Sequence, residues 1–228
     1  RYAHYVDNST SHKIIIHPES VYDIRGVAFG GCSSLEEVNF NAINCAPTKT
    51  DNSWVFKSCN NLSIVKIGEN VLKIPARLFG FCRGLCEILG GKSVNFIGKN
   101  AFYGCTSLKI IEFSNELTTI DEQAFYGCTA LESIKINAKE VNNYAFLGCS
   151  SLKTVILGSA TQSIREYVFK DCALEKIFYE GTSNEWYEVY KSFGFDTASA
   201  NATIYFYAKN PPESGNFWRY IDGLPVIW

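Results

Sequence analysis

The sequence predicts an α/β repeat solenoid, a stack of similar coils with a parallel β-sheet on one side and short helical turns on the other. Three observations predict it. A Phe-x2-Cys motif returns seven times, the same alternating apolar pattern follows each copy, and length changes concentrate in polar connectors. Self-similarity at a fixed period of about 20 to 50 residues indicates a stacked-repeat architecture. A β-rich C-terminal cap completes the prediction.

The Phe-x2-Cys motif sets the repeat frame. Its copies are Phe29/Cys32, Phe56/Cys59, Phe79/Cys82, Phe102/Cys105, Phe125/Cys128, Phe146/Cys149 and Phe169/Cys172. Successive cysteines lie 27, 23, 23, 23, 21 and 23 residues apart. A small or aliphatic residue precedes each Phe, and spacings of one and three suit a short helical turn that places Phe and Cys on one side. We therefore expect both side chains inside the coil.

A predicted strand follows each cysteine. The full unit is I-x3-A-F-x2-C-x2-L-x2-I-x-I, and its last part has the period-two alternation and β-branched centre of a half-buried strand. Residues 14–24 resemble the second half of an earlier unit. Three departures stand out: Asp51 replaces the entry aliphatic of repeat two, Gly90 replaces a strand apolar, and one residue is missing between Cys172 and Leu174.

The seven cysteines of the frame are predicted to be free, buried thiols. Equivalent side chains of stacked coils point the same way, one strand spacing of about 4.8 Å apart. A disulfide needs Cβ atoms about 3.5 to 4.5 Å apart and a near-perpendicular dihedral, which this arrangement supplies poorly. Cys45 and Cys86 lie outside the frame, and their state is left open. Cys82 with Cys86 lacks the further ligands that a metal site would need.

The tail is expected to cap the stack, so that residues 1–180 form the solenoid and residues 181–228 the capping segment. Trp186, Tyr187 and Tyr190 are predicted on or near one face of the first part, and a hairpin is predicted to turn at Asp222-Gly223. Sealing of the last coil by Trp186, Trp218 and Trp228 is favoured over a sugar platform. Tyr103 and Tyr126, one rung apart, are similarly expected to pack on each other, with sugar stacking as the alternative.

Composition and charge exclude several classes of function. The net charge of -2 offers no broad basic surface for nucleic acid. No apolar run reaches the ~18 to 20 residues of a membrane span, and the absence of methionine suggests a part of a longer polypeptide. The three histidines, His4, His12 and His17, all precede the first full repeat, and no catalytic motif is found. We therefore expect no enzyme, no cofactor and no metal site.

Two stretches, KSVNFIGKNAFYGCTSLKIIEF at 92–113 and ELTTIDEQAFYGCTALESIKI at 116–136, resemble the BspA-like leucine-rich repeats of bacterial secreted and cell-surface proteins. The resemblance covers about residues 14–180. It implies a right-handed solenoid with its sheet on the concave face. It also implies an extracellular or cell-surface recognition module that binds a protein on a host or neighbouring cell. A carbohydrate-binding surface module and a structural spacer are the alternatives.

The candidate binding residues are the outward positions of the predicted concave strands. They are Glu37, Asn39, Ile64, Lys66, Glu87, Ile110, Glu112, Ser133, Lys135, Thr154, Ile156, Lys176 and Phe178. Five apolar side chains are expected to be exposed on this face, namely Ile64, Leu89, Ile110, Ile156 and Phe178. Apolar residues rimmed by charges suit a protein-binding surface, although strands prefer β-branched residues in any case.

Overall fold

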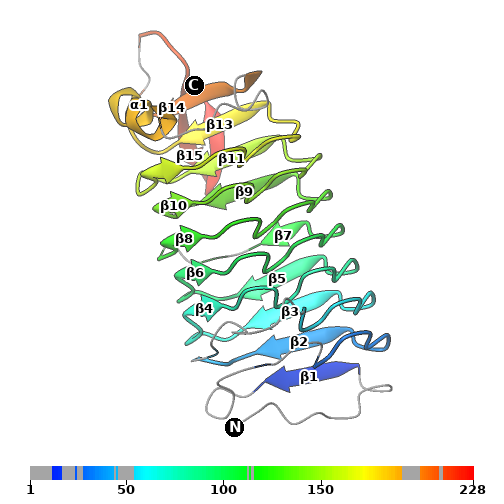
Figure 1. The fold of residues 1–228 in the computed structure, drawn as a ribbon. Helices are drawn as coiled ribbons and strands as arrows, with labels where there is room; N and C mark the ends of the chain where they lie inside the picture. The colour runs from blue at the N-terminus through cyan, green and yellow to red at the C-terminus, as the bar shows by residue number, and fades with distance from the viewer. Residues whose placement is uncertain are drawn as a thin grey trace.

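The structure is a computed structural model that describes residues 12–16, 24, 28–43, 45, 54–111, 113, 116–191, 201–210 and 213–228. These residues form an elongated stack of coils, with strand β1 at one end and the capping elements at the other (Figure 1). Each coil contributes one long strand and, in the middle of the stack, one short strand on the flank. The predicted repeat solenoid is confirmed.

The long strands pair in parallel along one side. They are β1 (Lys13–Ile16), β2 (Glu37–Phe40), β3 (Ile64–Ile67), β5 (Glu87–Gly90), β7 (Ile110–Ile111), β9 (Ser133–Ile136), β11 (Thr154–Leu157) and β13 (Lys176–Tyr179). Strands β1, β2, β3, β5 and β7 form one sheet, while β9, β11 and β13 belong to a second sheet that continues into the cap. The short strands form a third parallel sheet from β4 (Lys73–Ile74), β6 (Phe96–Ile97), β8 (Thr119–Ile120), β10 (Glu140–Val141) and β12 (Ser163–Ile164).

The side opposite the long strands consists of turns and not of the helical turns that the sequence predicts. The residue before every frame cysteine has a positive φ, from 59° to 73°, as at Gly104, Gly127 and Gly148. A second left-handed residue stands two positions before Phe in the later coils, as at Asn100 and Gln123. A right-handed helix cannot continue through such residues. The prediction of helical turns is therefore wrong.

Gly90 has a conformational reason for replacing a strand apolar. Its φ is +83°, and a Cβ atom there would approach the carbonyl oxygen of Ile67 to 2.3 Å. Gly91, the next residue, has a φ of +70°. A side chain at position 90 would thus meet the backbone of the neighbouring rung, so glycine allows β5 to end in a tight turn.

Stacked phenylalanine rings fill the core. The seven Phe residues of the frame are buried, and successive ring centroids lie 4.8 to 5.7 Å apart with interplanar angles of 4° to 19°. Leu residues two positions before the long strands and aliphatic residues from the flanking sheet surround this column. The prediction that Phe lies inside the coil is confirmed. Since each ring contacts mainly its neighbours, the column couples adjacent coils.

The frame cysteines form a second column beside the rings. From Cys59 to Cys172, each Sγ lies 2.9 to 3.3 Å from the carbonyl oxygen of the Phe in the preceding coil. Five of these carbonyl oxygens also accept the N–H of their own coil's cysteine. The thiol therefore occupies the second acceptor position of a buried carbonyl, which a purely apolar side chain would leave unpaired. All nine cysteines are free.

Burial keeps these thiols protonated. It raises the pKa of Cys59 to about 12, and those of Cys82, Cys105 and Cys149 well above their ordinary range. The pKa of Cys128 is raised for the same reason. A protonated thiol is the form that can donate to a carbonyl oxygen and is unreactive as a nucleophile.

Helix α1 (Ser183–Lys191) covers the end of the flanking sheet. It begins with a capping box, in which Thr182 N donates to Glu185 Oε2 (2.7 Å) and Glu185 N donates to Thr182 Oγ1 (3.3 Å). Trp186 packs on Tyr179 with ring centroids 5.4 Å apart, and Val189 is buried. Tyr187 is 58% exposed, so its predicted place on or near one face with Trp186 is wrong. The Tyr190 side chain lies outside the described residues.

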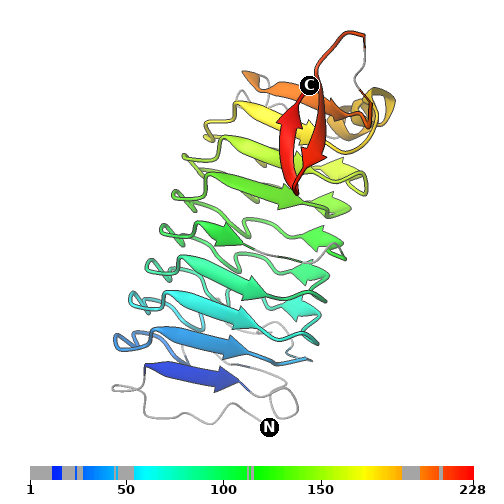
Figure 2. The same cartoon turned by 180° about the vertical axis from the view of Figure 1, so that it is seen from behind.

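Three strands follow the helix. Strand β14 (Thr203–Tyr207) pairs in parallel with β13, and β15 (Phe217–Ile221) pairs with the end of β14 and forms an antiparallel hairpin with β16 (Leu224–Ile227). Asp222 and Gly223 turn the hairpin with φ values of 51° and 78°, as a type I′ turn requires. The predicted hairpin is confirmed. It lies in front of the long strands near the C-terminal end of the stack (Figure 2).

Candidate interaction surface

The first and third residues of each long strand point away from the core, and together they form the strand face. First positions lie side by side in the order Lys13, Glu37, Ile64, Glu87 and Ile110, and then Ser133, Thr154 and Lys176. Third positions are Ile15, Asn39, Lys66 and Leu89, and then Lys135, Ile156 and Phe178. The register thus brings the predicted binding residues together, except for Glu112, which lies outside the described residues.

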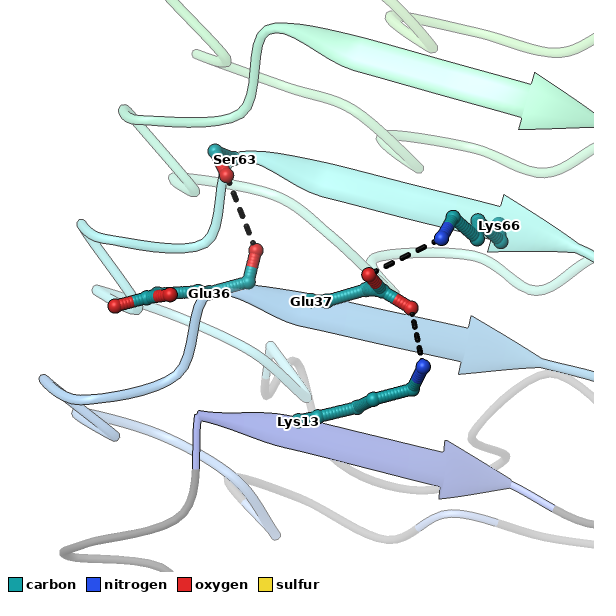
Figure 3. A network of polar contacts seen from close by, with 5 residues as sticks. All are labelled: Lys13, Glu36, Glu37, Ser63 and Lys66. Carbon is teal, nitrogen blue, oxygen red and sulfur yellow. Dashed lines mark hydrogen bonds and ion pairs between the residues drawn. The ribbon is translucent and has the colours of Figure 1, made fainter.

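At the N-terminal end of the strand face, the charges neutralise one another (Figure 3). Lys13 Nζ lies 2.8 Å from Glu37 Oε1, and Lys66 Nζ lies 3.1 Å from Glu37 Oε2. Hydrogen bonds from these two lysines lower the pKa of Glu37. Asn39 joins the group when its amide nitrogen is turned to donate to Glu37 (3.1 Å). A partner would have to compete with these contacts to use this end.

At the C-terminal end, the hairpin covers the strand face. Phe178 is only 4% exposed, because Tyr205 and Trp218 pack against it with centroid distances of 5.3 and 5.2 Å. Trp218 is fully buried, and its Nε1 donates to Tyr179 O (3.1 Å). The sequence predicts an exposed Phe178, and this prediction is wrong because the tail folds back over the outward side of β13.

Lys135 also contacts a residue of the hairpin and the residue that follows β13. Its Nζ lies 3.0 Å from both Glu180 Oε1 and the Tyr220 hydroxyl, and that hydroxyl donates to Glu180 (2.5 Å). Burial alone would lower the pKa of Lys135, but the bonds to Tyr220 and Glu180 outweigh it and raise the pKa. This three-membered contact ties the hairpin to β9, four strands away in its sheet. Its members Glu180 and Tyr220 escape prediction from the sequence.

Replacing Tyr220 by Phe should lower the free energy of unfolding by about 1 to 2 kcal/mol, because a hydroxyl bonded to two charged groups is lost. Urea denaturation measures the effect. Tyr207→Phe is the matched control, since Tyr207 lies on the adjoining β14, is 41% exposed, and has no hydroxyl bond among the described residues. Equal midpoints for Tyr220→Phe and the wild type would contradict the role assigned to Tyr220.

Between these two ends lies an open area that we call the central window, formed by Ile64, Glu87, Leu89, Ile110 and Ser133. Ile110 is 45% exposed, and Ile64 and Leu89 are half-buried. Glu87 is half-buried between Ile64 and Ile110 in the register. Within the described part of the chain, no cation pairs with Glu87 and no hydrogen-bond donor reaches its carboxylate. The window therefore combines exposed aliphatic groups with one uncompensated negative charge.

The opposite side of the solenoid carries a row of aromatic side chains. Tyr103 and Tyr126 stack with ring centroids 4.5 Å apart and an interplanar angle of 0°. Phe81 and Trp54 extend the row. The ring centroid of Phe81 lies 5.2 Å from that of Tyr103, and the centroid of Trp54 lies 4.8 Å from that of Phe81. The rings thus pack on one another, as expected. In this stack Tyr103 and Tyr126 each cover one face of the other.

The described residues present little for chemistry. His12 contacts Glu36 at 3.8 Å on the surface, while His4 and His17 lie outside the described residues. No three of the described His, Cys, Asp and Glu side chains gather as metal ligands would. A pocket of about 240 Å³ lies beside the flanking sheet, with Cys45, Ile74 and Phe96 among its mostly apolar lining. No described helix has the length and apolar content that crossing a bilayer requires.

Fold and surface together define a repeat solenoid whose long strand face is the extended feature available for binding. Residues 3–95 and 87–190 match the BspA type leucine rich repeat region, with six copies. The chain therefore belongs to the BspA-type leucine-rich repeat family, as its motifs predict.

Solved structures of similar fold come from bacteria. A leucine rich cell surface protein from Faecalibacterium prausnitzii A2-165 is 25% identical, with a TM-score of 0.56 over 78% of this chain and 62% of that one. A leucine-rich repeat protein from Bacteroides ovatus is 21% identical, with a TM-score of 0.44 over 85% of this chain and 63% of that one. The pneumococcal vaccine antigen PcpA is 14% identical, with a TM-score of 0.53 over 87% and 74% of the two chains. A search of curated proteins finds no match.

Proposed function

We propose that the chain is a non-enzymatic recognition module of a secreted or cell-surface bacterial protein, and that it binds a protein on a host or neighbouring cell. The observation that supports this proposal is the central window. It is a stretch of the strand face that neither the Glu37 ion pairs nor the described hairpin contacts occupy. Similarity to a leucine rich cell surface protein supports a location at the cell surface. This chain spans 62% of that protein's length.

A protein partner suits the window better than a glycan. Its aliphatic side chains Ile64, Leu89 and Ile110 offer apolar contact area, and Glu87 offers one acceptor of charge-assisted hydrogen bonds. It has no aromatic side chain on which a sugar ring could stack. The complementary surface would carry apolar side chains around a Lys or Arg. Lys135 and Phe178 act in the cap in this proposal and not in binding.

We also propose that residues 1–180 are the recognition solenoid and residues 181–228 its cap. The burial of Trp218 and Val189 and the pairing of β14 with β13 support this division. A stack of repeats exposes an apolar cross-section at its end, and a cap removes it from water.

Ile110→Lys tests the proposed function. The wild-type chain and this variant, each immobilised, are offered host-cell surface proteins, and the bound proteins are quantified by mass spectrometry. A charge in the middle of the window should reduce capture of the specific partner at least about tenfold, as loss of a central interface residue does. The matched control is Leu72→Lys, because Leu72 is 43% exposed on the flank and Ile110 is 45% exposed on the window.

A partner that is lost with Ile110→Lys and retained with Leu72→Lys supports the proposal. Identical capture of a specific partner by all three proteins would overturn the assignment to the central window, and absence of any specific partner would overturn the recognition proposal and favour a structural spacer. Loss of capture by Leu72→Lys alone would place the binding site on the flank, outside the central window.

A further inference from the structure

The hairpin presents the densest apolar surface of the described chain. Five of the ten large apolar side chains that are exposed belong to residues 221–228, namely Ile221, Leu224, Val226, Ile227 and Trp228. Pairing across the hairpin places Arg219 opposite Val226, and Ile221 opposite Leu224. Trp218 and Tyr220 point toward the strand face, so Arg219 and Ile221 point away from it. This outward side, Arg219, Ile221, Leu224, Val226 and Trp228, is called the hairpin patch below.

The hairpin patch carries one positive charge. The Arg219 guanidinium lies 3.9 Å from the ring centroid of Trp228, which fixes its position by a cation–π contact. Within the described residues no carboxylate pairs with it. Apolar side chains around an unpaired cation are the complement of the central window, where apolar side chains surround the unpaired carboxylate of Glu87.

The two surfaces also lie at different heights on the same side of the molecule. The hairpin lies on the strand face, as the contacts of Trp218 with Phe178 and of Tyr220 with Lys135 show. It therefore stands one layer, about 10 Å, above the neighbouring window. Figure 2 shows the hairpin in front of the long strands near the C-terminal end, while β3, β5 and β7, which carry most of the window, lie in the middle of the stack.

Pairing through the free edge of β16 is disfavoured. Trp228 N donates to Phe217 O, so alternation along the strand turns the backbone groups of residues 225 and 227 away from β15. The outward position 225 is proline, which has no N–H to donate. A second chain is thus directed to the faces of the hairpin and not to its edge.

We infer that two copies of this chain associate face to face, with the hairpin patch of each seated on the central window of the other. A two-fold axis along the strand direction, between window and hairpin, produces both contacts at once and closes the assembly as a dimer. Each contact places Arg219 of one copy against Glu87 of the other, among aliphatic side chains. This inference concerns the purified chain alone and does not depend on any other partner.

Sedimentation velocity of the purified chain tests the inference. Two contacts of about five residues on each side belong to the weaker class of interfaces, which bury less than about 1,200 Å² in total. The mean mass should therefore rise from one chain toward two between about 5 and about 500 μM. A mass of one chain throughout this range would overturn the inference.

Charge reversal identifies the contact. Arg219→Glu and Glu87→Arg should each weaken self-association at least about tenfold, because like charges then meet twice in the dimer. An equimolar mixture of the two variants should associate as the wild type does, since every contact again joins opposite charges. Arg83→Glu is the control, because Arg83 is exposed at a turn outside both surfaces. A mixture that stays monomeric, or equal weakening by Arg83→Glu, would overturn the pairing.

The test is separable from that of the proposed function. Arg219→Glu leaves the window intact, so it should weaken the dimer and retain capture of a host protein, whereas Ile110→Lys should impair both. Failure to dimerise leaves the recognition proposal standing, and failure to capture a partner leaves the dimer standing.

Discussion

Raising the pH from about 8 to about 10.5 in the presence of a reductant should unfold the protein in one steep transition. Cys59, Cys82, Cys105, Cys128 and Cys149 have raised pKa values in the folded state because they are buried. In the unfolded chain their pKa returns to about 8.5. Stability is fully present below the unfolded pKa, and it falls as the pH rises toward the folded values because only the unfolded chain then releases protons.

The effect is large enough for the buried thiols to determine how the free energy of unfolding falls at alkaline pH. Each thiol that ionises only on unfolding removes about 1.4 kcal/mol per pH unit above its unfolded pKa. Five such thiols give a limiting slope of about 7 kcal/mol per pH unit. Since domains of this kind are stable by about 5 to 15 kcal/mol, the fold should be lost within about two pH units.

Urea denaturation at a series of pH values measures the slope. Cys105→Ala should reduce it by about 1.4 kcal/mol per pH unit. Leu108→Ala, which truncates another fully buried side chain of the same coil, should lower stability and leave the slope unchanged. A wild-type slope below about 1.4 kcal/mol per pH unit between pH 9 and 10 would show that the column does not hold its thiols protonated.

The column of thiols also shows what the sequence can predict. The common frame of Phe and Cys places both inside each coil, since stacked repeats point equivalent side chains the same way. The prediction of helical turns is wrong because the type of residue before Cys does not by itself fix the backbone conformation there. Four of the seven residues there are glycine, which hints at positive φ, but Ser58, Phe81 and Asp171 adopt it too.

The sequence predicts which residues point outward on the strand face, but not which of them the cap covers. Alternation along each strand is local, so the outward rows from Glu37 to Lys176 follow from the sequence. The cover over Phe178 and Lys135 arises from contacts between distant segments, such as Lys135 with Tyr220, 85 residues away in the chain. One usable signal exists: Trp218 and Tyr220 alternate with Arg219 and Ile221, as expected for a hairpin with two different faces.

Replacing Phe125 by Ala should lower the free energy of unfolding by about 3 to 5 kcal/mol, because the change opens a cavity in the middle of the ring column. Phe125 is fully buried, and its ring stacks on Phe102 at 5.2 Å and on Phe146 at 5.1 Å. Phe113 contacts it at 6.3 Å. Both neighbouring coils therefore lose packing at once, and nearest-neighbour coupling between coils is weakened at that point.

Two companion variants separate volume from position. Phe125→Leu keeps most of the volume and should cost clearly less than Phe125→Ala. Phe29→Ala removes a ring that stacks on one frame neighbour only, Phe56 at 4.8 Å, so it should cost less than the central change. Circular dichroism during urea denaturation measures all three. If Phe29→Ala and Phe125→Ala have equal effects, the coils are held together by their strands alone, because a column of coupled rings must be most sensitive at its centre.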